Sequence, residues 1–142
     1  MTQVRFYVNL PDPVAYACRL LRKAHGLGTP AVVTGSPEAL SRLDEALWTF
    51  SPQDFLPHAR VGAVPDSVLA RTPIVMAADP TEAPHRALLL NLGGPVPVDV
   101  AQFERLFELV GLAEPDLAQA RERWKVYKAQ GFSVERHDAG AS

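Results

Sequence analysis

Hydrophobic and polar residues follow two periods along this chain, and the two periods predict alternating strands and helices. Residues 3–10 alternate and are rich in Val, Phe and Tyr, which is typical of a strand. Between residues 14 and 25 the apolar positions recur at three- and four-residue spacing, which indicates a helix with one buried side. By the same reasoning, further strands are expected at residues 31–34, 74–78 and 87–92, and further helices at residues 37–48, 98–110 and 116–130.

The order of these elements favours an α/β fold. Strand and helix alternate through the first half of the chain, which is the pattern of an open, mainly parallel sheet with helices on both faces, as in Rossmann-like folds. Residues 49–66 contain three prolines and are expected to form a long ordered loop. No linker or internal repeat interrupts the pattern, so we expect a single domain over residues 1–142. The polar end, rich in small residues, predicts a frayed tail from about residue 135.

Sheets of this class often bind nucleotides at the carboxyl edge, but the glycine pattern argues against a nucleotide here. A dinucleotide-binding chain carries closely spaced glycines after its first strand, whereas residues 10–13 contain none. Residues 34–37 could meet a phosphate at a helix N-terminus, although an ordinary helix cap also explains them. The glycines at 93–94 are followed by Pro95 and Pro97, which lack the amides a phosphate would need. We therefore predict a fold without a nucleotide-binding glycine loop, and no cofactor.

No catalytic or metal-binding pattern stands out either. The four histidines are widely separated, and none has a metal-ligand spacing with another His or Cys, so no metal is predicted. Cys18 is the single cysteine and lies on an apolar helical stripe, where a buried thiol is expected. Ser36 and Ser51 lack the glycine-flanked elbow of hydrolases. The favoured class is a binding protein, and a small nucleotide-using α/β enzyme remains the alternative.

Charge and hydropathy limit the possible partners. Lys and Arg number 14 against 16 for Asp and Glu, giving a formal net charge of −2. A protein that binds phosphates over a broad surface is usually basic. Any site for a negatively charged ligand on this chain is therefore expected to be confined to a small part of the surface. No apolar run approaches the roughly 18 residues of a membrane span, and the start of the chain is too polar for a signal peptide. A cytoplasmic location, away from membranes, is the expectation.

The predicted C-terminal helix offers one such local site. Arg121, Lys125 and Lys128 are spaced four and then three residues apart, which aligns their charges along one face. Leu117 and Trp124 project beside this stripe and add an apolar and aromatic surface. Such a surface suits a ligand that is acidic in one part and hydrophobic in another.

Two other interpretations of this helix stay open. In the first, Arg121 and Arg123 pair with neighbouring acids and Trp124 is buried, so that the helix serves the core alone. In the second, residues 123–128 interleave cations with aromatics, as single-stranded DNA-binding modules do. That platform would require Trp124 and Tyr127 to be exposed together, although they lie about 60° apart around a helix.

The proline-rich loop offers a second local site. Phe50, Phe55 and Leu56 lie among prolines, which can hold an aromatic side chain outward as an anchor for a partner. The alternative is that these side chains fold back onto the core.

Two segments taken together resemble the chi subunit family of bacterial DNA polymerase III. The first is RLDEALW at residues 42–48, followed by FLPH at residues 55–58, and the second is ARERWKVYKAQGF at residues 120–132. The first strand also fits with Arg-Phe-Tyr at residues 5–7, so the resemblance spans nearly the whole chain.

The resemblance implies a non-catalytic adaptor of the clamp-loader assembly, which meets nucleic acid only indirectly. One surface of the family binds the psi subunit, and Phe55, with its neighbours Leu56 and Phe50, falls at that contact. Another surface binds the acidic C-terminal tail of single-stranded DNA-binding protein, which ends in Pro-Phe. The residues that fall at the tail site are Val110, Leu117, Arg121, Trp124, Lys125 and Lys128. The family has a basic residue where this chain has Leu117, and Lys128 is expected to supply charge from the other side.

Overall fold

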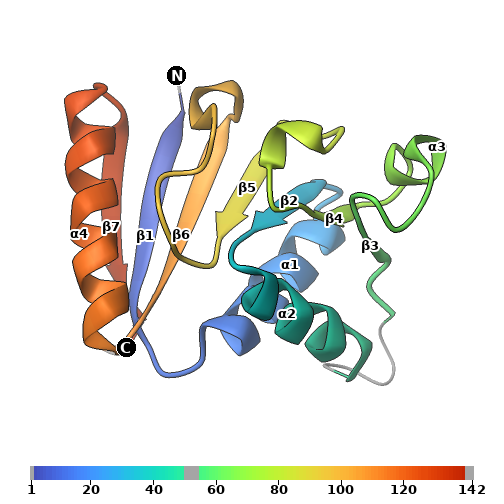
Figure 1. Ribbon diagram of the computed structural model, residues 1–142, viewed down its shortest axis with the longest axis horizontal. Helices are drawn as coiled ribbons and strands as arrows, with labels where there is room; N and C mark the ends of the chain where they lie inside the picture. Colours follow the sequence, from blue (N-terminus) through green and yellow to red (C-terminus); the bar gives the residue numbers. More distant parts are fainter. Residues whose placement is uncertain (1, 50–54, 140–142) are drawn as a thin grey trace.

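The computed structural model describes residues 2–49 and 55–139, which build one sheet with helices on its two faces (Figure 1). The strands are β1 Gln3–Leu10, β2 Ala31–Thr34, β3 His58–Arg60, β4 Ile74–Met76, β5 Leu88–Asn91, β6 Arg105–Gly111 and β7 Ser133–Asp138. The helices are α1 Pro13–Gly26, α2 Pro37–Thr49, α3 Asp66–Leu69 and α4 Glu114–Ala129, with 3₁₀ turns η1 Pro80–Glu82 and η2 Val100–Gln102.

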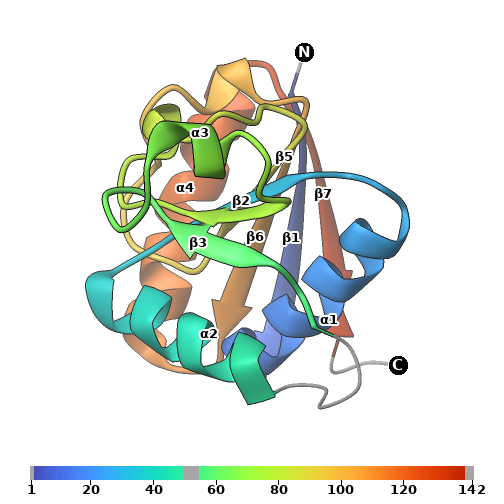
Figure 2. The same ribbon diagram turned by 90° about the vertical axis from the view of Figure 1, so that its right-hand side faces the viewer.

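The sheet confirms the predicted fold class. Its strand order is β3-β4-β2-β5-β6-β1-β7, and every neighbouring pair is parallel. One apolar cluster packs α1 and α2 against one face, and a second cluster packs α4 against the other. Figure 2 shows α1 and α4 on opposite sides of the strands. The first strand therefore lies inside the sheet, between β6 and the edge strand β7.

Local signals in the sequence account for the first helices and for the central strands. Asp12 caps α1 by accepting a hydrogen bond from the Ala15 amide at 3.1 Å, and Pro13 occupies the first turn. Ser36 caps α2 in the same way, accepting from the Ala39 amide at 3.1 Å. Strands β4 and β5 are buried along their whole length, as their continuous apolar runs predict.

The helix predicted at residues 98–110 is wrong. Only η2 is helical there, and β6 takes the rest of the segment. Leu106 and Val110 belong to the apolar cluster under α4, whereas Leu109 belongs to the cluster under α1. A strand inside a sheet that is covered on both faces shows no polar alternation, so its apolar residues also fit a helical spacing.

The tail predicted to fray from about residue 135 is in fact an ordered strand up to Asp138. Strand β7 pairs with β1, and Asn9 donates to the Asp138 carboxylate at 2.8 Å. Edge strands are commonly rich in charged side chains, which made this segment look like a disordered end. The long loop predicted at residues 49–66 likewise contains β3, and α3 follows it. Within residues 2–49 and 55–139, no helix has the length and apolar character needed to cross a membrane.

Candidate functional site

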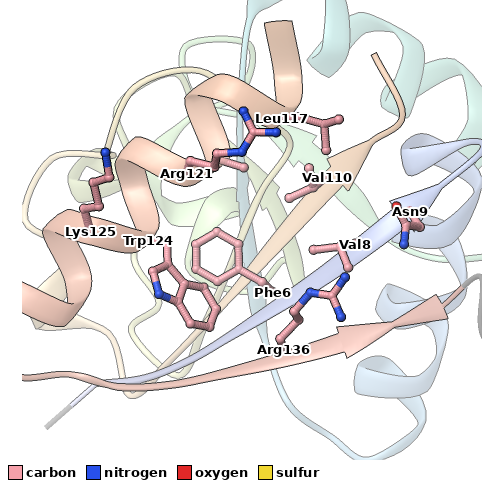
Figure 3. A pocket seen from close by; sticks show the side chains of 10 residues that line it. Phe6, Val8, Asn9, Val110, Leu117, Arg121, Trp124, Lys125 and Arg136 are labelled. Atoms are coloured by element: carbon pink, nitrogen blue, oxygen red, sulfur yellow. The ribbon is translucent and has the colours of Figure 1, made fainter. Parts of the chain in front are cut away.

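A hollow of about 370 Å³ opens between α4 and the strands at one end of the sheet. Figure 3 shows the side chains around it, which come from α4 on one side and from β1, β6 and β7 on the other. The lining residues are Phe6, Val8, Asn9, Val110, Leu117, Ala120, Arg121, Trp124, Lys125 and Arg136. The fold therefore brings together every residue predicted for the tail site except Lys128.

Apolar side chains form the floor of the hollow. The rings of Phe6 and Trp124 lie 5.1 Å apart between centroids and are tilted by 55°. Val110 also lines the floor and is buried, and Leu117 is half-buried. Trp124 itself is half-buried, so its indole packs on the core and still presents a surface to the hollow. The interpretation in which this indole is buried is thereby wrong.

Three cations stand around this apolar floor. Arg121 and Lys125 lie on α4, and Arg136 reaches in from β7 on the opposite side, as Figure 3 shows. Lys125 is 3.3 Å from Glu122, but both side chains are largely exposed, so the pair is weak. Arg136 lies 3.6 Å from the Asp138 carboxylate. Arg121 has no ion pair among the residues that the structure describes, which leaves its guanidinium available to a ligand.

Lys128 does not line the hollow. It is exposed on the same stripe as Arg121 but seven residues further along α4, which is about 10 Å along the axis. The third cation that lines the hollow is instead Arg136, which comes from a different element. Arg136 was missed because it falls in the segment predicted to fray.

A buried polar network fixes the orientation of α4. Glu108, on β6, accepts hydrogen bonds from Arg123 Nε at 2.9 Å, Tyr127 Oη at 2.6 Å and Asn91 Nδ2 at 3.0 Å. Arg123 also donates to the Gly94 carbonyl. Burial raises the pKa of Glu108, and the charge of Arg123 and these hydrogen bonds act against that rise. Because each polar group in the network has a partner, the helix is held in one rotational position.

This network decides between the interpretations of the helix. Arg123 pairs with Glu108 across the core, whereas the structure gives Arg121 no acidic partner within the described residues. Tyr127 is fully buried, so it cannot share an exposed platform with Trp124. This burial contradicts the alternative in which the helix binds single-stranded DNA through Trp124 and Tyr127 exposed together.

An exposed aromatic cluster lies at the other end of the molecule. Phe55 is 63% exposed and Trp48 is 60% exposed, with ring centroids 5.6 Å apart. His58 is buried beneath the Trp48 ring, 4.8 Å away, and its Nδ1 lies 2.7 Å from the Leu56 carbonyl oxygen. Leu56 belongs to the core and is 3% exposed, so it supports the cluster from below. Phe50, the third residue predicted here, lies outside the described residues.

Comparison with known proteins identifies the family of this chain. A family model described as "DNA polymerase III chi subunit, HolC" matches residues 1–135. The chain belongs to the DNA polymerase III chi subunit family. It is 38% identical over 144 residues to a DNA polymerase III subunit chi of Pseudomonas aeruginosa, with 96% of each chain covered. It is 28% identical over 126 residues to a subunit of the same name from Haemophilus influenzae, with 87% of this chain and 85% of the relative covered.

The groups considered for catalysis have ordinary structural roles in this chi-family chain. Burial raises the pKa of the Cys18 thiol to about 11, which disfavours the nucleophilic thiolate at neutral pH. Ser36 is occupied as the cap of α2. Within residues 2–49 and 55–139, no cluster of three or more His, Cys, Asp or Glu residues could hold a metal ion.

Proposed function

We propose that this chi-family chain is a non-catalytic adaptor of the DNA polymerase III clamp-loader assembly with two separate binding surfaces. The hollow beside α4 would bind the acidic C-terminal tail of single-stranded DNA-binding protein. The exposed pair Trp48 and Phe55 would bind the psi subunit. The observation that carries the proposal is the hollow itself, where an apolar floor is surrounded by cations on both sides.

The chemistry of the hollow matches a peptide that is acidic and ends in Phe. A terminal phenyl ring would enter between Phe6, Leu117 and Trp124, and burying such a ring contributes about 2 kcal/mol. The carboxylates would pair with Arg121, which can hold a carboxylate by two parallel hydrogen bonds. Each exposed charge pair adds only about 0.2–1 kcal/mol. These contributions support an affinity in the micromolar range that falls as the salt concentration rises.

The chemistry of the aromatic cluster matches an apolar partner. Two large rings that are mostly exposed and 5.6 Å apart form a preassembled anchor, since each ring already restricts the other. Aromatic side chains of this kind often supply much of the binding energy of a protein interface. The cluster lies on α2 and the segment before β3, which are distant along the sheet from β7 and the hollow. Both partners could therefore bind the same molecule.

Capture of partners by variants tests the two-surface proposal. The full chain carrying Phe55→Ala should lose the psi subunit and keep single-stranded DNA-binding protein. The chain carrying Arg121→Ala should show the opposite pattern. If either substitution removed both partners from a chain that is still folded, the proposal of two separate surfaces would be wrong.

A further inference from the structure

The face of the sheet turned away from the hollow carries a second concentration of aromatic residues. Tyr7 lies at its centre, with ring centroids 5.3 Å from Tyr16, 5.3 Å from Phe107 and 5.4 Å from His137. These four rings come from β1, α1, β6 and β7. Tyr7 itself is buried, whereas Tyr16 and Phe107 are half-buried and retain a surface toward solvent.

Three exposed arginines lie on these rings. The guanidinium carbon of Arg19 is 5.2 Å from the Tyr16 centroid, and that of Arg105 is 5.8 Å from the Phe107 centroid. Arg5 lies 6.0 Å from the centre of the Tyr7 ring and pairs with Glu135 at 2.9 Å. We call this surface the arginine–aromatic face; it consists of Arg5, Tyr7, Tyr16, Arg19, Arg105, Phe107 and His137.

The charge of this face is local and positive on a chain whose formal net charge is negative. Helix α1 contains no acidic residue, and beyond Arg19 it adds the exposed cations Arg22 and Lys23. Two acids face the same region. Glu135 is engaged with Arg5, and Asp12 caps the start of α1. Arg19 and Arg105 have no ion pair among the described residues, so their charge is available to an anion.

Two hollows extend the face along β1. One of about 200 Å³ is lined by Arg5, Arg105 and Phe107, near the start of the strand. The other, of about 460 Å³, is lined by Tyr16, Arg19 and His137, near its end. Residues 3–5 of β1 line the first hollow, and Leu10 lines the second. At 3.3 Å per residue, the two hollows are therefore about 20 Å apart along the strand. The cations and rings therefore form an elongated track.

We propose that the arginine–aromatic face binds single-stranded nucleic acid. The phosphates pair with Arg19 and Arg105, while bases stack on Tyr16, Phe107 or the guanidinium planes. This combination of a cationic track with aromatic platforms is the one by which proteins bind single strands without reading sequence, because every base has a face to stack. The fold alone does not require that Arg19 and Arg105, which are exposed and have no ion pair among the described residues, both lie over aromatic rings. An acidic peptide would use the charges but leave the rings without a role.

The face and the proposed tail site lie on opposite sides of the sheet. On β1, Phe6 lines the hollow beside α4, whereas Tyr7 belongs to the arginine–aromatic face. A chain that held the protein tail on one side could therefore contact the neighbouring single strand on the other. The nucleic-acid proposal does not depend on the tail site, because the two use different residues.

Fluorescence anisotropy of the full chain with a labelled 20-nucleotide oligothymidylate tests the proposal. With two phosphates neutralised, by Arg19 and Arg105, the logarithm of the binding constant should fall with log salt at a slope of about −1.4, which is about sevenfold between 50 and 200 mM salt. The double variant R19E/R105E should weaken binding by more than tenfold and reduce the slope. The matched control K128E/R71E changes the net charge equally and should stay within about twofold of the unaltered chain.

Three results of these binding measurements would overturn the proposal: no binding at 50 mM salt, equal losses in both double variants, or displacement of the oligonucleotide by an equally charged polyglutamate peptide at the same concentration. The last result would assign the face to acidic peptides. Photocrosslinking of the unaltered chain to an oligonucleotide containing 4-thiothymidine needs no variant. Crosslinks at Tyr16, Phe107 or His137 support the proposal, and crosslinks confined to α4 contradict it.

Discussion

Arg123 and Glu108 form a buried ion pair between α4 and the centre of the sheet, with Nε 2.9 Å from Oε1. Both side chains are almost completely shielded from water. By turning Arg123 inward, the pair holds α4 in the position that leaves Arg121 and Lys125 beside the hollow. A buried polar contact thus determines which cations of the helix are available to a ligand.

Removing one member of this pair should destabilise the protein strongly. Arg123→Met leaves the Glu108 carboxylate buried without its cation, and such losses cost about 3–5 kcal/mol. Urea denaturation should show this decrease in the free energy of unfolding, whereas Arg121→Met, on the same helix, should change it by less than about 0.5 kcal/mol. The double variant R123M/E108M should lose less than the sum of the two single losses. Strict additivity would show that the pair does not act as a unit.

Arg136 should contribute to binding of the acidic tail although it lies on a different element from Arg121. Arg136→Ala removes one exposed charge pair and should weaken a peptide with an acidic stretch and a Pro-Phe end by about three- to fivefold. Lys128→Ala is the matched control, because that cation does not line the hollow. Titration of both variants by intrinsic tryptophan fluorescence gives the comparison, because Trp124 lines the hollow and Trp48 does not. An equal effect of the two substitutions would mean that only the general charge of this region matters.

Trp48 and Phe55 should act as one anchor for the psi subunit. Alanine at either position should reduce binding by at least tenfold, and the double variant should lose less than the two effects combined, because the rings pack together. Surface plasmon resonance with immobilised psi subunit measures both effects. Val98→Ala, which removes an exposed apolar side chain elsewhere, is the control. Leu56→Ala should instead lower stability by about 2–5 kcal/mol, since Leu56 is in the core.

Alkaline pH should weaken the fold through Cys18. Burial raises the pKa of this thiol from 9.0 to about 11, so between those values the unfolded chain releases a proton that the folded chain keeps. The thiol therefore contributes stability that is fully present below pH 9 and is lost as the pH rises to about 11. Urea denaturation at a series of pH values should show a shallower decline for Cys18→Ala than for the unaltered chain. Identical slopes would contradict the pKa assigned to this thiol.

Periodicity predicts most of this fold and fails where a strand's environment departs from the usual alternation. Strand β6 lies inside the sheet with both faces covered, so its apolar run also fits a helical period. Strand β7 lies at the edge with charged side chains exposed, so its composition resembles that of a frayed end. In both cases the position of the strand in the sheet determines which of its side chains are buried. That position cannot be predicted from the local pattern of apolar and polar residues.

The candidate site likewise depends partly on spacing within one helix, which the sequence shows, and partly on contacts between distant segments, which it does not. Leu117, Arg121, Trp124 and Lys125 share one helix, so their spacing alone places them together. The partner of Arg123 is Glu108 on another element, and helical periodicity could not choose between Arg123 and Arg121 for the inward position. Arg136 joins the hollow only because β7 pairs beside β1.

Isothermal titration calorimetry with two peptides tests the central claim most directly, because the claim requires both the aromatic end and the acidic stretch. The unaltered chain should bind an acidic peptide ending in Pro-Phe with micromolar affinity, and an otherwise identical peptide ending in Pro-Ala at least tenfold more weakly. Trp124→Ala should remove most of this difference, and Arg121→Ala should weaken both peptides. Equal affinity for the two peptides, or unchanged binding in both variants, would show that the hollow beside α4 is not the site of the tail.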